Sequence, residues 1–182
     1  FVSKLAQRMG ALKVGHGTNA ETTLAPLVNR KAVSSVGELV KDALDKGASQ
    51  LVGGTVSTGP GCYYPATVLG NVKSDARIVQ EEVFGPVVAV VKVKDENEAL
   101  TIANKSEYGL AGYVYTKNLA RGLKVCEQLQ VGMIGLNRGL VSDPSAPFGG
   151  VKQSGLGREG GYEGIDERSE EHTSELQSRG LI

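Results

Sequence analysis

Two acidic residues followed by an aromatic residue form a group that could bind a ligand. Glu81 and Glu82 precede Phe84, and a Gly-Pro turn at residues 85–86 follows directly. A carboxylate at such a position can accept hydrogen bonds from paired sugar hydroxyls, as acidic residues do for nucleotide ribose. The aromatic side chain can pack against a flat ring. A solvated acidic turn with a core phenylalanine explains the same residues equally well, so both interpretations stay open.

A second candidate lies in a long stretch without clear periodicity, residues 137–157. A loop of this length inside a compact domain is usually functional or disordered. Phe148 could line an apolar pocket, and the adjacent glycines at 149–150 allow a close backbone approach. The Ser142 hydroxyl, earlier in the loop, could donate a hydrogen bond to a carboxylate oxygen. The alternative is an irregular surface loop.

The remaining reactive residue types do not combine into a catalytic or metal centre. Cys62 stands in a turn without a local base, and Cys126 lies in a helical pattern typical of a buried structural thiol. His16 has no second histidine or cysteine nearby, which argues against a metal site. The G-x-G-x-x-G run at residues 155–160 follows a loop and not a strand, so it does not fit a dinucleotide-binding motif. We therefore expect neither a nucleophile nor a metal here.

Composition excludes several classes of partner. The chain has 182 residues, and its 20 Lys and Arg balance its 20 Asp and Glu, so the basic surface of a nucleic-acid-binding protein is not indicated. The longest clean apolar run, residues 87–91, is far short of the roughly 20 residues that span a bilayer. Two cysteines cannot make a disulfide framework, which favours a reducing, cytoplasmic compartment.

The periodicity of apolar residues predicts an α/β fold. Helices are expected between strands, and such alternation favours a mostly parallel sheet flanked by helices. The continuous Val and Ala run that opens residues 87–93 suits a strand buried on both faces. We expect this strand to share one sheet with residues 113–116 and 133–136, and a last helix to start at residue 157. The expected helices are residues 1–12, 30–46, 95–105 and 118–128.

Together these segments resemble the aldehyde dehydrogenase superfamily, specifically the C-terminal part of its catalytic domain. The resemblance covers residues 1–167, and the run from residue 135 to 160 is most similar to the succinate-semialdehyde dehydrogenase group. The segments that carry it are residues 12–15, 26–29, 81–86, 108–111 and 147–159.

The resemblance implies roles for four residues. Glu82 matches the glutamate that binds the nicotinamide ribose, and Phe84 matches the aromatic residue that packs near the nicotinamide. Phe148 matches a phenylalanine of the aldehyde tunnel, and Ser142 matches the serine that holds the distal carboxylate of a semialdehyde. The cofactor is then NAD or NADP. The family reaction forms a thiohemiacetal on a cysteine, transfers a hydride, and hydrolyses the resulting thioester, here giving succinate.

The resemblance also implies that important residues are missing. In the family, the nucleophilic cysteine, the general-base glutamate, the oxyanion-hole asparagine and the dinucleotide-binding domain precede the counterpart of Phe1. We expect a piece of a longer, homo-oligomeric enzyme that is inactive alone. Residues 168–182 depart from the family and look like a translated sequencing adapter, so we assign the domain to 1–167 and treat that tail as non-native. The alternatives are a dehydrogenase for another aldehyde and a non-catalytic packing or interaction module.

Overall fold

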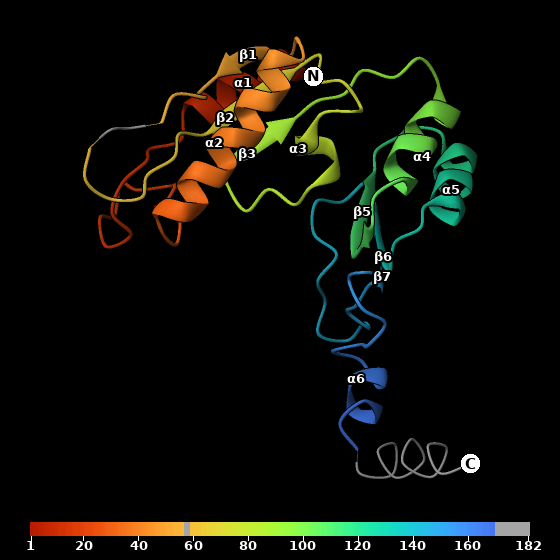
Figure 1. Ribbon diagram of the computed structural model, residues 1–182. Coiled ribbons are helices and arrows are strands. Elements are labelled where there is room, and N and C mark those ends of the chain that lie inside the picture. The colour runs from red at the N-terminus through yellow and green to blue at the C-terminus, as the bar shows by residue number, and fades with distance from the viewer. Residues whose placement is uncertain (57–58, 170–182) are drawn as a thin grey trace, which may run out of the picture. The chain divides into compact units, whose positions relative to one another are not determined.

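The computed structural model describes residues 1–56 and 59–169, which fall into two compact units (Figure 1). Unit 1 is Phe1–Lys94, and unit 2 begins at Asp95. Both units combine helices with strands, which confirms the α/β class. The predicted non-native tail lies, from residue 170 onward, outside the described residues.

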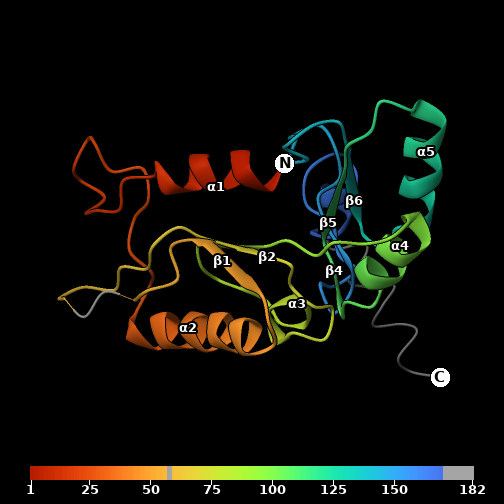
Figure 2. The same ribbon diagram turned by 90° about the horizontal axis from the view of Figure 1, so that it is seen from above.

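Unit 1 has three layers, with a small sheet between two helices. Figure 2 shows the sheet between α1 and α2. Its strand order is β1-β2-β3, with β1 antiparallel and β3 parallel to β2, and Thr67 lies opposite Val87. The elements of this unit are α1 (Val2–Gly10), α2 (Arg30–Asp45), β1 (Ser49–Val52), β2 (Thr67–Gly70), α3 (Arg77–Gln80) and β3 (Val87–Ala89).

The core of unit 1 lies between α2 and the face of the sheet beneath it. The Asn29 side chain caps the helix by accepting a hydrogen bond from the Ala32 backbone N–H at 2.8 Å. Gly47, at φ 94°, ends it in a Schellman motif, in which Ala48 N–H donates to the Ala43 carbonyl. The helix buries one apolar face, which packs against Tyr64, Leu69, Val72, Ala76 and Ile78; that face consists of Val33, Val36, Leu39, Val40 and Ala43.

Unit 2 contains two small sheets. Strands β5 and β6 pair in parallel through the crossover helix α5, and β4 and β7 pair antiparallel. Helices α4 and α5 lie on the same side of β5 and β6 in both ribbon views (Figures 1 and 2). The elements are α4 (Glu96–Asn104), β4 (Tyr108–Gly109), β5 (Ala111–Val114), α5 (Leu119–Gln128), β6 (Met133–Leu136), β7 (Val151–Lys152) and α6 (Glu163–Asp166).

The expectation that residues 87–93, 113–116 and 133–136 share one sheet is wrong. Within the described residues the strands form three separate sheets, and β3 does not share a sheet with β5 and β6. Strand β3 covers only Val87–Ala89 and is half-buried, because it is the outer strand of its sheet. The strand buried throughout is β2, which lies between two neighbours. Local sequence signals give the presence of a strand, whereas its partners depend on distant segments.

The helix expected from residue 157 is also wrong. Arg158 has no regular secondary structure, and Glu159 forms an isolated antiparallel bridge with Phe148. Gly160 and Gly161 follow with φ of 69° and 59°, a conformation that interrupts a right-handed helix. Only the short α6 (Glu163–Asp166) is helical in this region.

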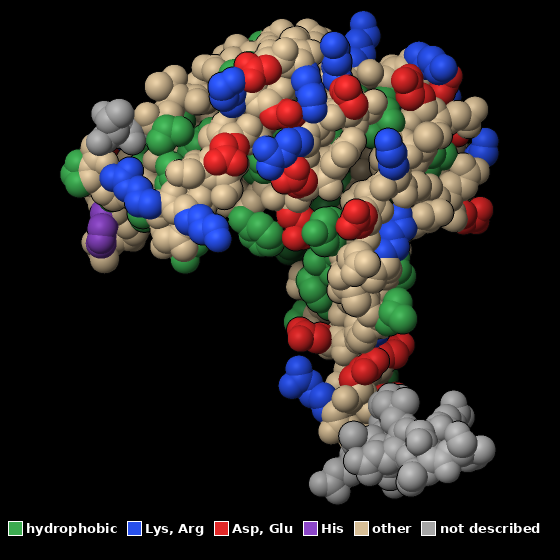
Figure 3. All heavy atoms as spheres, viewed as in Figure 1, with side chains coloured by type: hydrophobic (Ala, Val, Ile, Leu, Met, Phe, Trp, Pro, Cys, Tyr) green, Lys and Arg blue, Asp and Glu red, His purple; other side chains and the backbone are tan. Residues whose placement is uncertain are grey.

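The surface of the described chain carries charges of both signs. Figure 3 shows Lys and Arg side chains interspersed with Asp and Glu on the visible face. Over residues 1–56 and 59–169, no helix is long and apolar enough to cross a membrane.

Candidate functional site

Glu82 and Phe84 lie at a pocket of unit 1 with a volume of about 300 Å³. They face residues at the N-terminal end of α2 and the segment just before it. Phe84 is 77% exposed, so it is not the core phenylalanine of the simpler interpretation. The pocket is lined by Val28, Asn29, Lys31, Ala32, Ser35, Val36, Leu39, Glu82 and Phe84.

The turn after Phe84 explains how these side chains reach α2. A Cβ atom on Gly85 would lie 2.8 Å from Cγ2 of Val36, closer than ordinary packing allows. Only a residue without a side chain therefore lets this turn press against the buried face of α2. Pro86 then accepts a hydrogen bond from Thr67 N–H at 2.8 Å, which fixes the start of β3 beside β2. The sequence Phe-Gly-Pro thus places the aromatic ring at the pocket edge.

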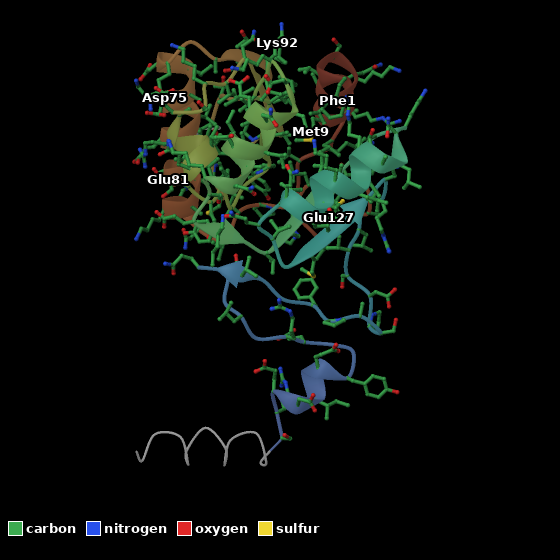
Figure 4. All side chains as sticks on the ribbon, turned by 90° about the vertical axis from the view of Figure 1, so that its right-hand side faces the viewer. Phe1, Met9, Asp75, Glu81, Lys92 and Glu127 are labelled. Atoms are coloured by element: carbon green, nitrogen blue, oxygen red, sulfur yellow. The ribbon has the colours of Figure 1, made fainter. Side chains whose placement is uncertain are left out.

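The two adjacent glutamates have different roles in the structure. Glu81 accepts two hydrogen bonds from the Arg77 guanidinium, from Nε at 2.6 Å and from Nη2 at 3.1 Å. These bonds hold the pKa of Glu81 below its usual value. Figure 4 shows Glu81 on the side of the unit formed by α2 and α3. Glu82 makes no hydrogen bond or ion pair with the described residues, so its carboxylate is available to a ligand.

A second carboxylate fastens the start of α3 to α2. Asp42 accepts a hydrogen bond from the Arg77 backbone N–H at 2.9 Å and pairs with Lys46 at 3.0 Å. The backbone N–H of Arg77, followed by the Lys46 ammonium, lowers the pKa of Asp42. Arg77 therefore connects two acidic residues, Asp42 and Glu81, and sets the segment that leads to Glu82.

The sequence analysis missed the contribution of α2 to this pocket. Lys31 and Ser35 are separated by one helical turn and lie on the same face, with Ala32 between them. The available signal was the N-cap Asn29, which marks a helix end with free backbone N–H groups. Nothing in the local sequence links that helix end to residues 82–84, because the contact spans some fifty residues of chain.

In unit 2, Ser142 and Phe148 share the loop that follows β6. The Ser142 side chain is exposed and makes no hydrogen bond with the described residues. The neighbouring Asp143 is occupied locally, because its carboxylate accepts bonds from the Ser145 hydroxyl at 2.7 Å and the Ser145 N–H at 3.0 Å. Both bonds lower the pKa of Asp143. The hydroxyl of Ser142 is therefore a free donor on this loop.

Phe148 is half-buried and held in place by its backbone. Its N–H donates to the Glu159 carbonyl at 2.6 Å, and Glu159 N–H donates back at 2.8 Å. The next residue, Gly149, is buried, and a Cβ on it would lie 2.2 Å from the Gly157 carbonyl oxygen, a clash that glycine avoids. The prediction that glycines here permit a close backbone approach is confirmed. The structure gives Phe148 a fixed backbone, and it brings Glu82 and Phe84 together at one pocket of the other unit.

The sequence predicts neither a metal site nor a nucleophilic cysteine in this chain. No group of three or more His, Cys, Asp or Glu side chains there could hold a metal ion. Cys62 and Cys126 are free thiols. The interpretation of Cys126 as buried is wrong, because it is half-buried on an α5 surface where Leu123 is 52% exposed. The G-x-G-x-x-G run follows the turn after β7 and opens no helix.

The pocket thus presents a carboxylate that can bind the hydroxyls of a nucleotide ribose and an aromatic ring that can pack against a flat ring. The family model described as the aldehyde dehydrogenase family matches residues 1–173. The chain therefore belongs to the aldehyde dehydrogenase family. This family uses NAD or NADP.

Three relatives make the similarity specific. A succinate-semialdehyde dehydrogenase of Paenarthrobacter nicotinovorans is 48% identical over 167 residues, covering 92% of this chain and 37% of the relative. A glutarate-semialdehyde dehydrogenase of Pseudomonas aeruginosa is 44% identical, with 92% and 35% covered. The crystal structure of succinate-semialdehyde dehydrogenase from Burkholderia pseudomallei superimposes with a TM-score of 0.89 at 46% identity, with 92% and 35% covered. The chain thus spans about a third of the length of these relatives.

Proposed function

We propose that this chain is the C-terminal part of the catalytic domain of an NAD(P)-dependent dehydrogenase that oxidises succinate semialdehyde to succinate. The observation that carries the proposal is the pocket at which Glu82 and Phe84 meet the N-terminal end of α2. Residues 1–167 belong to this domain, and residues 168–182 are a non-native tail. The whole enzyme is a cytoplasmic homo-oligomer whose partner is a small aldehyde.

The pocket of unit 1 suits the nicotinamide half of the cofactor. The unpaired Glu82 carboxylate has two acceptor oxygens, so it can accept hydrogen bonds from both hydroxyls of a ribose. The exposed Phe84 ring offers an apolar face to the nicotinamide. NAD or NADP, when bound, supplies the hydride acceptor. These two residues orient it and take no part in proton transfer.

The loop of unit 2 suits the substrate. The free hydroxyl of Ser142 donates to the distal carboxylate of succinate semialdehyde, and Phe148 contributes apolar surface to the carbon chain. Reciprocal hydrogen bonds to Glu159 hold the backbone from which that ring projects. Glutarate semialdehyde, one methylene longer, is the second candidate substrate, because the Pseudomonas aeruginosa relative carries that name.

Replacing Glu82 by glutamine in the full-length enzyme is expected to raise the KM for the cofactor roughly tenfold, because hydrogen bonds to a charged acceptor are lost. The matched control is Glu81→Gln. Glu81 is bound to Arg77 and does not line the pocket, and glutamine keeps an acceptor oxygen for Arg77, so the control should leave the cofactor KM within about twofold. Initial rates at varied cofactor concentration measure both variants. Equal effects at the two positions would contradict the assignment.

The chain by itself is expected to have no aldehyde dehydrogenase activity. Thioester chemistry needs a thiolate beside a base and oxyanion donors. The two cysteines are half-buried free thiols, and no histidine lies near either of them in the sequence. The measurement is NADH formation by the purified 182-residue chain with succinate semialdehyde. Steady turnover that survives further purification would overturn this part of the proposal.

A further inference from the structure

Lys152 lies in an unusual backbone conformation and uses its ammonium group inside the protein. Its φ is 55°, in the left-handed region that residues with side chains rarely adopt. The side chain is half-buried, and Nζ donates to the carbonyls of Asn104 at 2.7 Å and Ser106 at 3.0 Å. Asn104 is the last residue of α4, where the helix leaves acceptors unpaired and favours a positive charge, and Ser106 follows the helix directly after its C-cap Lys105. Lys152 thus ties β7 to the end of α4.

Asn104, whose carbonyl accepts a hydrogen bond from Lys152, is also held through its side chain. The Asn104 side chain donates to the Gln128 carbonyl at 2.8 Å and accepts from Gln130 N–H at 2.9 Å. It therefore joins the end of α4 to the end of α5 at residues that are distant in sequence. One acceptor of the Lys152 ammonium therefore belongs to a hydrogen-bonded junction between the ends of two helices.

Only three residues separate Phe148 from Lys152, and packing and hydrogen bonds restrict the movement of this short segment. Gly149 and Gly150 are buried, and the Arg158 guanidinium donates to the Gly150 carbonyl at 2.8 Å. Phe148 is bonded to Glu159 in both directions. A displacement of Lys152 at one end of this short segment must therefore move Phe148 or break the bonds that hold it.

We propose that Lys152 is a positioning residue for the aldehyde site, which acts through Phe148. Its ammonium, held by the carbonyls of Asn104 and Ser106, fixes the backbone that presents the Phe148 ring to the substrate. The inference rests on the proposed function for the role of Phe148, whereas the mechanical link from Lys152 to Phe148 does not. A misplacement of about 1 Å in a positioning element costs up to roughly a hundredfold in rate.

The mechanical link is tested on this chain by hydrogen exchange. Lys152→Met keeps the length of the side chain and removes the ammonium. We expect the amides of Phe148 and Glu159 to exchange at least about tenfold faster, while amides in the core of unit 1 keep their rates. Lys105→Met, an exposed lysine at the end of the same helix, is the matched control and should change neither amide. Unchanged exchange in Lys152→Met overturns the proposal.

The functional link is tested in the full-length enzyme. Lys152→Met should raise the aldehyde KM about tenfold, with the cofactor KM within about twofold, and Lys152→Arg should recover most of the loss because it keeps a cation. A general loss of stability would instead lower the amount of active enzyme and leave both KM values unchanged, which overturns the positioning role. If Lys152→Met does not fold, Lys152→Gln, which retains one donor, takes its place.

The Phe148→Ala variant distinguishes a failure of the Lys152 proposal from a failure of the proposed substrate site. A Phe148→Ala variant that raises the aldehyde KM, beside a Lys152→Met variant that does not, rejects Lys152 alone. A Phe148→Ala variant with an unchanged aldehyde KM removes Phe148 from the substrate site, and with it both the proposed substrate contact and the positioning role of Lys152.

Discussion

Replacing Gly132 by alanine is expected to destabilise the chain by roughly 3 kcal/mol or more, the upper end of the overpacking range. A Cβ at this position would overlap the Gly149 carbonyl oxygen and lie 2.7 Å from the Gly150 Cα. All of these atoms belong to backbone, which cannot rotate away as a flexible side chain would. The loop that carries Phe148 would have to leave the start of β6. The free energy of unfolding from urea denaturation measures the loss.

Gly139→Ala is the matched control for this prediction. It lies in the same unit, and a Cβ there would meet only the Tyr115 hydroxyl at 3.5 Å, an ordinary contact. Its free energy of unfolding should stay within about 0.5 kcal/mol of the parent chain. A similar loss in both variants would mean that the close approach of Gly132 and Gly149 does not hold this loop.

Replacing Ser142 by alanine in the full-length enzyme is expected to lower kcat/KM for succinate semialdehyde about ten- to a hundredfold. A hydrogen bond to a charged group contributes roughly 1.5–3 kcal/mol, which converts to that range. An uncharged aldehyde of similar length has no carboxylate at this point, so its kcat/KM should change little. Steady-state kinetics with both aldehydes measure the difference.

Phe148→Ala supplies the contrast for Ser142→Ala. Because the ring is apolar surface shared by every aldehyde, its removal should lower kcat/KM for the charged and the uncharged substrate alike. Equal losses for the two aldehydes in Ser142→Ala would reject the carboxylate role of this serine and favour a dehydrogenase for another aldehyde.

The sequence predicted those features that depend on neighbouring residues. Asn29 and Asp95 stand directly before α2 and α4, and their side chains cap these helices by accepting hydrogen bonds from the Ala32 and Glu98 backbone N–H groups. Gly47 ends α2 because only a residue without Cβ takes its φ of 94° at low cost. The period of apolar residues in α2 identified the face that is now buried against β2. Each of these signals lies within a few residues of the element that it sets.

Features that depend on distant segments could not be predicted in this way. The valine-rich run at residues 87–93 predicts a strand buried on both faces, yet β3 is half-buried and has only one neighbour among the described residues. The sequence also could not separate Glu81 from Glu82, because the difference lies in the Arg77 side chain one helical turn earlier. The helix expected from residue 157 does not start there, because Glu159 pairs with Phe148, a residue outside that segment.

Strands β5 and β6 form a two-stranded sheet, and within the described chain each has a single partner. Their outer edges offer rows of backbone donors and acceptors to any extended segment that meets them. During refolding at high protein concentration, copies of this chain would encounter one another before those rows were shielded. Association should then compete with folding as a second-order process, and the yield of monomer should fall as the protein is concentrated. Dilution should therefore raise the fraction of native chain that is recovered.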